Sequence, residues 1–569
     1  MQKRIIIKDK PEAIVVEKLK NALGVDDSIA VLLAQRGINS FDEAKKFFRP
    51  ELTDLHDPFL MKDMDKAVDR LDIAILKDEK ILVYGDYDVD GTTAVSIMYS
   101  FLRSFTSNIL YYIPDRYNEG YGVSKIAIDF ALNQKVSLVI ALDCGIQDNE
   151  KIKYAKSNGI DFIVCDHHLP GAKLPEAFAV LDPKQKGCDY PFKELSGCGV
   201  GFKLIQGYLQ KNNMPFSRVN EFLDLAAISI SADIVPITGE NRVLTYVGLQ
   251  QINSNPRTGI KAILDLINLN RELNVNDVVF QLAPRINAAG RMDHGKKIVE
   301  LLTTDNPLTA NEIAIEVNLN NTDRIDHDMA TTENALQQLN ADAGFISRKT
   351  TVLYNENWSK GVIGIVASRL IEQYYRPTIL FTQSNGKLCG SARSIKNVDI
   401  YEALVQCSQY IERFGGHKYA AGITLKMENF DLFKNSFEEV IARTITDDQL
   451  IPEIEIDAEL SFDLITPKFY RILNQFAPFG PGNMRPVFIT NKVVDTGYSK
   501  IVGSNQQHLK VSVKDKNSKM VMNGISFGMA DKYELIKQGN PFSIIYNLDE
   551  NTWNGKTEIQ LNVREILVG

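Results

Sequence analysis

Three aspartates stand at alternate positions in the segment ILVYGDYDVDGTT, residues 81–93. They are Asp86, Asp88 and Asp90, and Gly91 follows them directly. The pattern D-x-D-x-D-G begins an EF-hand calcium loop, whose twelfth position supplies a bidentate Glu. Counted from Asp86, that position is Ile97, and an apolar run rather than a helix precedes the acids. The residues therefore argue against a calcium loop.

The tail of the same segment, D-x-D-G-T, is also typical of haloacid-dehalogenase phosphatases, which use one aspartate as a nucleophile. Histidines would have no role in such a site. This chain, however, offers Asp143 in LDCG, Asp166 with His167 and His168 in CDHH, and Asp233 in SADIVP. These groups favour a site that collects carboxylates and imidazoles from four separate segments.

Carboxylates gathered this closely repel one another and raise each other's pKa unless a cation neutralises them. Mg²⁺ and Mn²⁺ prefer such oxygen ligands, and an imidazole among them favours Mn²⁺ or a mixed site. Two such ions would suit phosphodiester hydrolysis. Taken alone, an aspartate after a strand is more often a helix N-cap or a turn residue. The four segments together favour a metal site.

Short apolar runs alternate with helical stretches around these acids. The runs 80–85, 108–114, 136–143, 161–166 and 178–183 predict strands, and the stretches 92–105, 124–132 and 149–159 predict helices. This alternation is typical of βαβ units in a largely parallel sheet. Because open α/β sheets bind ligands at the carboxyl ends of their strands, we expect the acids to meet at one edge.

The whole chain divides into five predicted parts. These are a helical entry module (1–55), a parallel-sheet α/β domain (56–307), a long connecting helix (308–343), a smaller α/β domain (344–450) and a β-barrel of the OB type (451–569). The connecting helix is predicted from a long polar stretch that is poor in Gly and Pro. The barrel is predicted from short β runs separated by turns.

The composition limits the class of protein. A net charge of −8 argues mildly against a surface that is basic throughout, although a local basic groove remains compatible with it. Six cysteines without a C-x-x-C pair predict neither a zinc site nor a disulfide framework. The first residues lack the pattern of a signal peptide, and no apolar run is long enough to span a membrane. We therefore expect a cytoplasmic protein that does not bind a membrane.

The motifs GDYDVDG, LDCG, CDHH and ADIVP resemble the successive motifs of the DHH phosphoesterase superfamily. Six further segments resemble its single-strand-specific bacterial exonucleases: PDRYNEGYGVS (114–124), APRINAAGRM (283–292), WSKGVIGIVASRL (358–370), GSARS (390–394), FGGHKYAAG (414–422) and FAPFGPGN (476–483). The DHH tripeptide alone would be a weak signal, whereas the whole set is highly specific. The smaller α/β domain resembles the DHHA1 domain of the same proteins.

The resemblance implies a metal centre with two divalent ions, Mn²⁺ or Mg²⁺. The implied ligands are Asp86, Asp88, Asp90, Asp143, His167 and Asp233, with Asp143 as the bridging acid. Asp166 and His168 would orient the ligands or act as acid and base, because a ligating imidazole commonly needs a carboxylate to hold it. Smaller members of the superfamily carry a His where this chain has Tyr84, and Asp86 is expected to take its place.

The resemblance also implies a path for a DNA strand. Its 5′ terminal phosphate and adjacent backbone would be held by Ser391, Arg393, Gly415, Gly416 and His417, since glycine amides and the arginine fork both suit phosphate. The path itself would be lined by Arg116, Arg285, Asn287 and Arg291. From the residues alone, the glycine pair could equally form a turn, and Arg285 and Arg291 could form surface ion pairs.

Four aromatic residues of the barrel region are candidates for stacking on bases: Phe476, Phe479, Tyr498 and Phe527. Most aromatic side chains in a small barrel belong to its core, so we expect at least half of these four to be core residues.

The activity implied by the resemblance is hydrolysis of single-stranded DNA from its 5′ end, in recombination and repair. The implied partners are single-stranded DNA, a single-strand-binding protein and a helicase, and the expected state is a monomer. Two alternatives remain open: a phosphodiesterase of short oligonucleotides or cyclic dinucleotides, and a non-catalytic DNA-binding scaffold in replication. The entry module and the barrel argue against the first, and the complete set of acids argues against the second.

Overall fold

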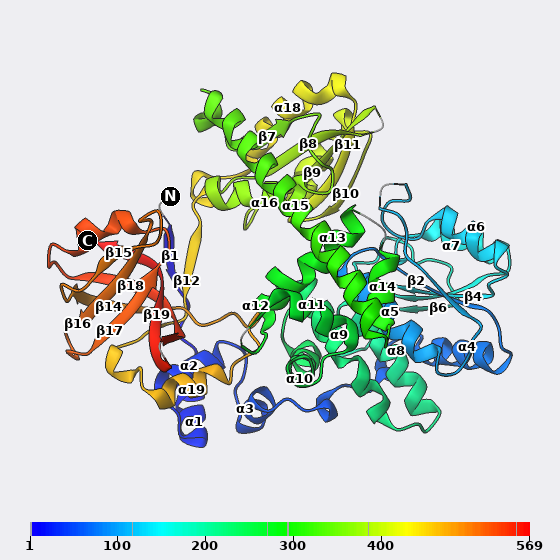
Figure 1. Cartoon of the computed structure of the whole chain (residues 1–569), viewed down its shortest axis with the longest axis horizontal. Helices are drawn as coiled ribbons and strands as arrows, with labels where there is room; N and C mark the ends of the chain where they lie inside the picture. Colours follow the sequence, from blue (N-terminus) through cyan, green and yellow to red (C-terminus); the bar gives the residue numbers. More distant parts are fainter. Residues whose placement is uncertain are drawn as a thin grey trace. The chain divides into compact units, whose positions relative to one another are not determined.

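The computed structural model describes residues 3–116, 118–269, 271–292, 295–384, 386–553 and 555–568 (Figure 1). The side chains of Ala289, Arg291, Met292 and Trp553 lie outside this description. The chain forms two compact units, each described by itself below. One is built mainly from Val317–Ile454, and the other contains Ile7–Gly290 and the chain from Glu455 onward.

A five-stranded parallel sheet lies at the centre of the larger unit, in the order β3-β2-β4-β5-β6. Its strands are β2 (Ile81–Gly85), β3 (Ile109–Tyr112), β4 (Leu138–Leu142), β5 (Asp161–Cys165) and β6 (Ala179–Leu181). β2 and β4 are buried along their whole length, as expected where helices cover both faces of a parallel sheet. The predicted parallel α/β domain is therefore confirmed.

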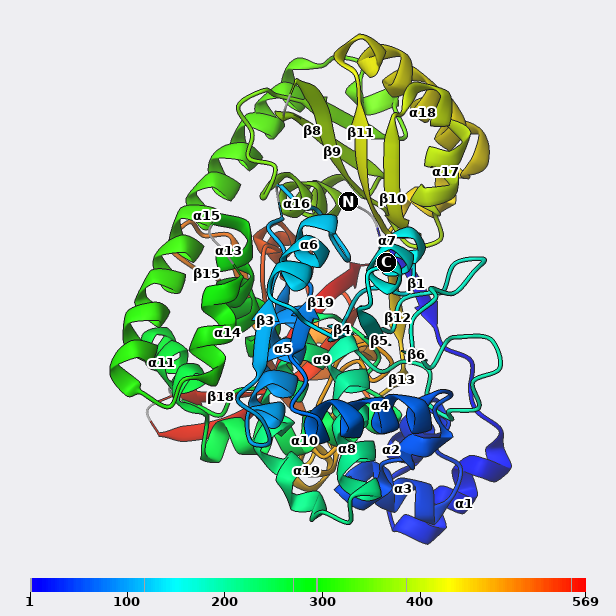
Figure 2. The same cartoon turned by 90° about the vertical axis from the view of Figure 1, so that its right-hand side faces the viewer.

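Helices cover this sheet on both sides (Figures 1 and 2). On one face, α6 (Lys125–Asn133) and α7 (Asn149–Ser157) share a core with Tyr84 and Ala141. On the other, α8 (Gly197–Lys211) approaches Leu142 so closely that a Cβ on Gly201 would lie 2.9 Å from the leucine side chain. Alternate residues of a strand point to opposite faces, which is why neighbouring residues of β4 serve two helix layers.

Other helices complete the unit. They are α4 (Met64–Leu76), α5 (Val89–Leu102), α9 (Leu223–Ala232), α10 (Gly239–Ser254), α11 (Thr258–Ile267), α12 (Val275–Asp277), α13 (Ala283–Met292) and α14 (Lys296–Thr303). α5 begins at Val89, inside the acid motif, and not at residue 92 as the sequence predicted. The reason is local: the Asp88 side chain accepts a hydrogen bond from the Gly91 N–H and caps the helix at this point.

The predicted connecting helix is present as α15 (Pro307–Ala341). In the smaller unit, a mixed sheet has the order β10-β11-β9-β8-β7. Its strands are β7 (Thr351–Tyr354), β8 (Thr378–Ser384), β9 (Lys387–Arg393), β10 (Arg413–His417) and β11 (Ala420–Leu425), with helices α16 (Ile363–Tyr374), α17 (Ile400–Gln406) and α18 (Phe430–Thr444). β7 and β8 are parallel and the remaining neighbours are antiparallel.

The C-terminal strands form the predicted barrel. They are β13 (Ala458–Glu459), β14 (Phe488–Asp495), β15 (Lys500–Val502), β16 (His508–Asp515), β17 (Val521–Ser526), β18 (Phe542–Trp553) and β19 (Lys556–Val568). The order is β14-β18-β19-β17-β16, and a further pairing of β14 with β16 closes it. A short helix, α20 (Tyr533–Ile536), lies between β17 and β18. This is the OB-type arrangement.

The N-terminal helices pack against the barrel region. They are α1 (Ala13–Leu23), α2 (Asp27–Ala34) and α3 (Phe41–Phe48), and they share one hydrophobic core with α19 (Pro467–Asn474) and the barrel strands. Before them, β1 (Arg4–Ile7) forms a two-stranded sheet with β12 (Glu453–Ile456). Among the described residues, no helix is both long and apolar enough to cross a membrane.

Candidate metal centre and strand-end site

The register of the parallel sheet brings the acid motifs to one level. Gly85 of β2 pairs with Leu142 of β4, and Leu142 pairs with Cys165 of β5. The residue after each of these is an aspartate, so Asp86, Asp143 and Asp166 leave the sheet side by side at its carboxyl edge. Three of the four predicted segments, the CDHH segment among them, are therefore placed at this edge by the ends of their strands.

Asp143 occupies the left-handed backbone region, with φ at 60°. Aspartate tolerates this conformation better than most residues, and it turns the side chain back over the strand ends. A Cβ on Gly197 would lie 2.5 Å from the Asp143 Cβ. Position 197 therefore needs glycine, because any side chain would displace the acid.

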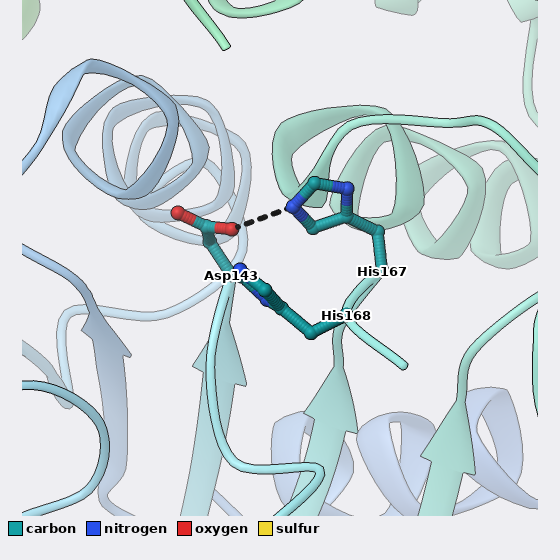
Figure 3. Close-up of side chains that lie close together, drawn as sticks. All are labelled: Asp143, His167 and His168. Atoms are coloured by element: carbon teal, nitrogen blue, oxygen red, sulfur yellow. Dashed lines mark ion pairs between the residues drawn. The ribbon is translucent and has the colours of Figure 1, made fainter. Parts of the chain in front are cut away.

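The predicted ligands form overlapping groups in which the ligand atoms lie within 4.8 Å of one another. The groups are Asp86–Asp88–Asp143, Asp90–His167–Asp233 and Asp143–His167–His168. Asp143 Oδ1 lies 3.2 Å from His167 Nε2, and Asp233 Oδ2 lies 3.6 Å from the same nitrogen. Figure 3 shows Asp143 and the two histidines rising from neighbouring strands. The structure thus brings together all six predicted metal ligands, and Asp143 belongs to two of the groups.

Asp90 is held by the protein on both of its oxygens. Its carboxylate accepts hydrogen bonds from the N–H groups of Gly197 and Cys198, at 2.7 and 2.8 Å, and from the Ser229 hydroxyl at 2.6 Å. The two amides belong to the N-terminus of α8, where a negative charge is favoured. Oδ1 accepts the bonds from Cys198 and Ser229, whereas Oδ2 accepts only the bond from Gly197, so Oδ2 keeps a lone pair with which Asp90 can bind a cation.

The CDHH motif forms a hydrogen-bonded relay. Asp166 Oδ1 lies 2.7 Å from His168 Nδ1, and the other ring nitrogen of His168 lies 3.0 Å from the Tyr121 hydroxyl. Burial opposes the charge of His168, but the hydrogen bond and the charge of Asp166 outweigh it and raise the pKa of His168 to about 9. Tyr121 was not predicted as a site residue, although it lies in PDRYNEGYGVS.

The cluster has the electrostatics of a cation site. Burial first, and the neighbouring carboxylates second, raise the pKa of Asp86, Asp143 and Asp233 well above the usual range of an aspartic acid. Burial lowers the pKa of His167 to about 4, so its imidazole is neutral, which is the form that binds a metal. Within the described residues, Asp86 Oδ1, Asp143 Oδ1 and both His167 nitrogens are buried without a hydrogen bond. Since buried polar atoms are normally satisfied, this donor set fits divalent cations.

Asp182 was missed by the sequence reasoning. It directly follows β6, it is fully buried, and its Oδ2 has no hydrogen bond among the described residues. Burial, and then the charge of Asp166, raise its pKa to about 7. The signal that identified the other acids, an aspartate directly after an apolar strand, is present in LDP as well and would have found it.

Three predicted substrate residues belong to segments that contact the acid motif. The Arg116 guanidinium lies 4.9 Å from the centre of the Tyr87 ring, within the acid motif itself. Helix α13 carries Arg285 and Asn287, and it approaches so closely that a Cβ on Gly290 would lie 2.5 Å from the Tyr87 carbonyl oxygen. The side chain of Arg291, also predicted here, lies outside the described residues.

The remaining predicted substrate residues meet in the smaller unit. Through β11, the register aligns Ser391 of β9 with Gly415 of β10, and Arg393 with His417. Residues two apart on a strand share a face, so these four residues lie on one side of the sheet. Arg393 Nη1 donates to the Ser391 hydroxyl at 3.0 Å. Gly416, with φ at 148°, lies between them, and a Cβ there would meet the Ala420 carbonyl oxygen at 2.3 Å.

Two of the four barrel-region aromatics belong to the hydrophobic core, as expected, although only one of them is fully buried. Phe476 is fully buried in the shared core and Phe479 packs against that core, whereas Tyr498 is 82% and Phe527 60% exposed. Lys500 on β15 stands directly opposite Lys510 on β16. Like charges at paired positions repel, so this part of the barrel favours an anion.

Three family models match the chain. The DHH family, N-terminal domain matches residues 80–230, the DHHA1 domain matches 347–443, and the RecJ OB domain matches 456–565. These matches agree with the parallel sheet, the mixed sheet and the barrel described above.

Curated relatives match nearly the whole chain. The single-stranded-DNA-specific exonuclease RecJ of Bacillus subtilis is 36% identical, over 98% of this chain and 70% of its own length. The protein of the same name from Escherichia coli is 32% identical, over 94% of this chain and 95% of its own length. The crystal structure of Thermus thermophilus RecJ in complex with Mn²⁺ superposes with a TM-score of 0.85 at 28% identity, covering 99% of this chain and 79% of that one. Its Mg²⁺ complex gives a TM-score of 0.78.

Proposed function

The chain belongs to the RecJ family of single-stranded-DNA-specific exonucleases, and from this premise we propose that it removes nucleotides from the 5′ end of single-stranded DNA in recombination and repair. The observation that carries the proposal is the cluster of six metal-ligand candidates at the carboxyl edge of the parallel sheet. The row of phosphate-binding candidates on the mixed sheet supports a substrate that is recognised by its end.

The donor set is suited to two divalent ions, Mn²⁺ or Mg²⁺. One ion would be held by Asp86, Asp88 and Asp143, and the other by Asp90, His167 and Asp233, with Asp143 between them. Such ions, when bound, lower the pKa of a water molecule and neutralise the negative charge on a phosphodiester. The hydrogen bonds from α8 and Ser229 fix Asp90 in place, so its ligand atoms are oriented before an ion arrives.

His168 is the candidate for proton handling. Asp166 orients its ring through Nδ1, and in the ion-free protein its pKa of about 9 keeps it protonated at neutral pH. A protonated imidazole beside Asp143 can donate a hydrogen bond to a phosphate oxygen, or a proton to the departing 3′ oxygen. The Tyr121 hydroxyl, 3.0 Å from His168 Nε2, marks the direction in which that nitrogen points.

The barrel supplies a surface for the rest of the strand. Tyr498 offers an exposed ring to a base, and the facing pair Lys500 and Lys510 offers positive charge to the backbone. Aromatic stacking and a basic path are the usual means of binding single strands without regard to sequence. The same family resemblance implies that the chain acts as a monomer, together with a single-strand-binding protein and a helicase.

The test of this function uses four substrates with the purified full chain and Mn²⁺ or Mg²⁺. They are a long single strand labelled at its 5′ end, the same strand labelled at its 3′ end, a blunt duplex and a dinucleotide. We expect the 5′ label to appear at once as a mononucleotide while the 3′-labelled strand shortens gradually, with no use of the duplex. Mononucleotides released first from the 3′ label, internal cleavage, or a preference for the dinucleotide would contradict the proposal.

We expect Arg393→Ala to weaken the use of 5′-phosphorylated ends. Arg393 lies in register with His417 and donates to Ser391, and hydrogen bonds to a charged group contribute about 1.5–3 kcal/mol, so kcat/KM should fall roughly 10- to 100-fold. Strands with a 5′ hydroxyl should be affected much less. The measurement is kcat/KM for both kinds of end.

Lys387→Ala is the matched control, because Lys387 is a cation at the other end of the same strand and pairs with Glu412. It should leave kcat/KM unchanged for strands with a 5′ phosphate and for strands with a 5′ hydroxyl. An equal loss on phosphorylated and unphosphorylated ends in Arg393→Ala would count against a phosphate contact.

A further inference from the structure

The segment that follows Asp233 has a strained backbone. Asp233 ends α9, and the next residue, Ile234, has φ at 60°. A β-branched residue rarely adopts this left-handed conformation, in which glycine would be expected. Such strain persists only where the surrounding structure holds it. The contacts of the residues that follow Ile234 therefore help to determine the orientation of Asp233.

Those contacts come from the connector between α19 and the barrel, residues 475–484, which contains the FAPFGPGN motif. The Ile237 N–H donates to the Pro481 carbonyl at 2.7 Å. A Cβ on Gly480 would lie 2.5 Å from Ile237 Cδ1, so the two segments are in direct contact. The loop after Asp233 has a second contact: the Asn241 side chain in α10 (Gly239–Ser254) donates to the Pro236 carbonyl at 3.0 Å.

Arg242 fixes the connector to α10. It is 4% exposed, and its guanidinium donates to the carbonyls of Phe476 at 2.8 Å and Ala477 at 2.9 Å. It also donates to the carbonyl of Phe47 at 2.9 Å and lies 3.9 Å from the centre of that ring. Among the side chains, only arginine offers five N–H donors in one plane. A buried arginine can therefore donate to several carbonyl oxygens at once.

The connector is secured on its far side as well. Asn483 donates to the carbonyls of Phe476 and Pro478, at 2.8 and 2.9 Å, and accepts a hydrogen bond from Arg36 at 2.8 Å. Arg36 belongs to the chain just after α2, so the N-terminal helices hold the connector that in turn contacts the Asp233 loop. Arg242 and Asn483 thus bond to the backbone carbonyls of the connector, and Arg36 bonds to the Asn483 amide.

We propose that the 475–484 connector is part of the scaffold of the metal centre, and that Arg242 is a positioning residue for Asp233. The inference rests on the proposed role of Asp233 as a metal ligand. It assigns a function to the FAPFGPGN motif: the connector fixes Ile237, and with it the strained turn that points Asp233 toward His167. Loss of Arg242 would remove these hydrogen bonds from the connector. Asp233 would then be oriented less well, and it would bind a divalent ion more weakly.

Mn²⁺ affinity, measured by isothermal titration calorimetry on the full chain without substrate, tests this proposal. We expect Arg242→Gln to weaken one Mn²⁺ site about tenfold, the effect typical of residues that support a metal ligand, and Arg242→Lys to weaken it less. Asp233→Ala serves as the reference for complete loss of that site. If wild type binds no Mn²⁺, the proposed function fails; if wild type binds and Arg242→Gln binds equally well, only the present inference fails.

Arg257→Gln is the matched control for a purely structural arginine. Arg257 pairs with the buried Asp224 in the same unit and makes no contact with the connector in the described structure. It should lower the melting temperature but leave Mn²⁺ affinity unchanged. Equal losses of affinity in Arg257→Gln and Arg242→Gln would overturn the assignment.

If Arg242→Gln does not fold, Gly480→Ala keeps the proposal testable, because it displaces the Ile237 side chain and removes no hydrogen-bond donor. The same weakening of one site is expected. Wild-type Mn²⁺ affinity in this variant would overturn the proposal.

Discussion

Asp143→Asn is expected to abolish hydrolysis while the fold is retained. Asp143 belongs to two of the ligand groups and is 2% exposed, so its charge cannot be replaced by a neighbour. Loss of a metal-bridging charge removes several kcal/mol of transition-state stabilisation, which corresponds to a loss of at least about 10³-fold in kcat. Asparagine tolerates the left-handed backbone and has nearly the same shape, so the contact with Gly197 is preserved. The measurement is single-turnover hydrolysis, together with the melting temperature.

Asp78→Asn is the matched control. Asp78 also has a left-handed backbone, with φ at 49°, and accepts a hydrogen bond from Thr106, but it lies before β2, at the opposite edge of the sheet. It should retain full activity. Because Asp143→Asn removes one charge from a repelling cluster, its ion-free melting temperature should be no lower than that of wild type. Metal-dependent activity within tenfold of wild type in Asp143→Asn would refute the two-ion assignment.

Removal of divalent ions is expected to stop hydrolysis and to make the folded protein less stable as the pH rises. In the ion-free protein the pKa of Asp86, Asp143 and Asp233 is raised by burial and then by mutual repulsion, and that of His168 is raised to about 9. A group whose pKa is raised on folding stabilises the protein below its unfolded pKa and loses that contribution as the pH rises through the folded value. The raised pKa of His168 therefore lowers the stability as the pH rises from about 6.5, the unfolded pKa of histidine, to about 9, and the raised pKa of each of the three carboxyl groups acts in the same direction.

The measurement is the melting temperature with a chelator between about pH 6.5 and 9, where it should fall as the pH rises. His167 does not complicate this window, because its pKa, lowered to about 4 by burial, affects stability only below about pH 6.5. With Mn²⁺ at 100 times its dissociation constant, each occupied site adds about 2.7 kcal/mol, and the fall should disappear. Asp78→Asn should behave as wild type, and a melting temperature that rises with pH in the chelated protein would contradict the ion-free electrostatics.

The strands and the long helix were predictable because each has a local signature. Apolar runs of six to eight residues between helical stretches predicted the parallel sheet, and the polar stretch 308–343 predicted α15. The start of α5 was predicted three residues late, since the cap by Asp88 falls inside the motif that was assigned to metal binding. Only the structure shows which of the aromatic stacking candidates lie in the core and which lie on the surface. The sequence of the barrel region does not show which aromatic ring faces the interior.

The sequence by itself determined that carboxylates and imidazoles follow parallel strands, and such strands end at one edge whatever the rest of the fold does. Tertiary structure alone decided how those groups are held. The anchoring of Asp90 by α8 and Ser229, the relay from Asp166 through His168 to Tyr121, and the support of the Asp233 loop by the 475–484 connector each join segments far apart in the chain. The physical reason is that a motif fixes which atoms can bind a cation. The orientation of these atoms depends on hydrogen bonds to distant segments. The pattern of residues along the chain does not show which distant residues make those bonds.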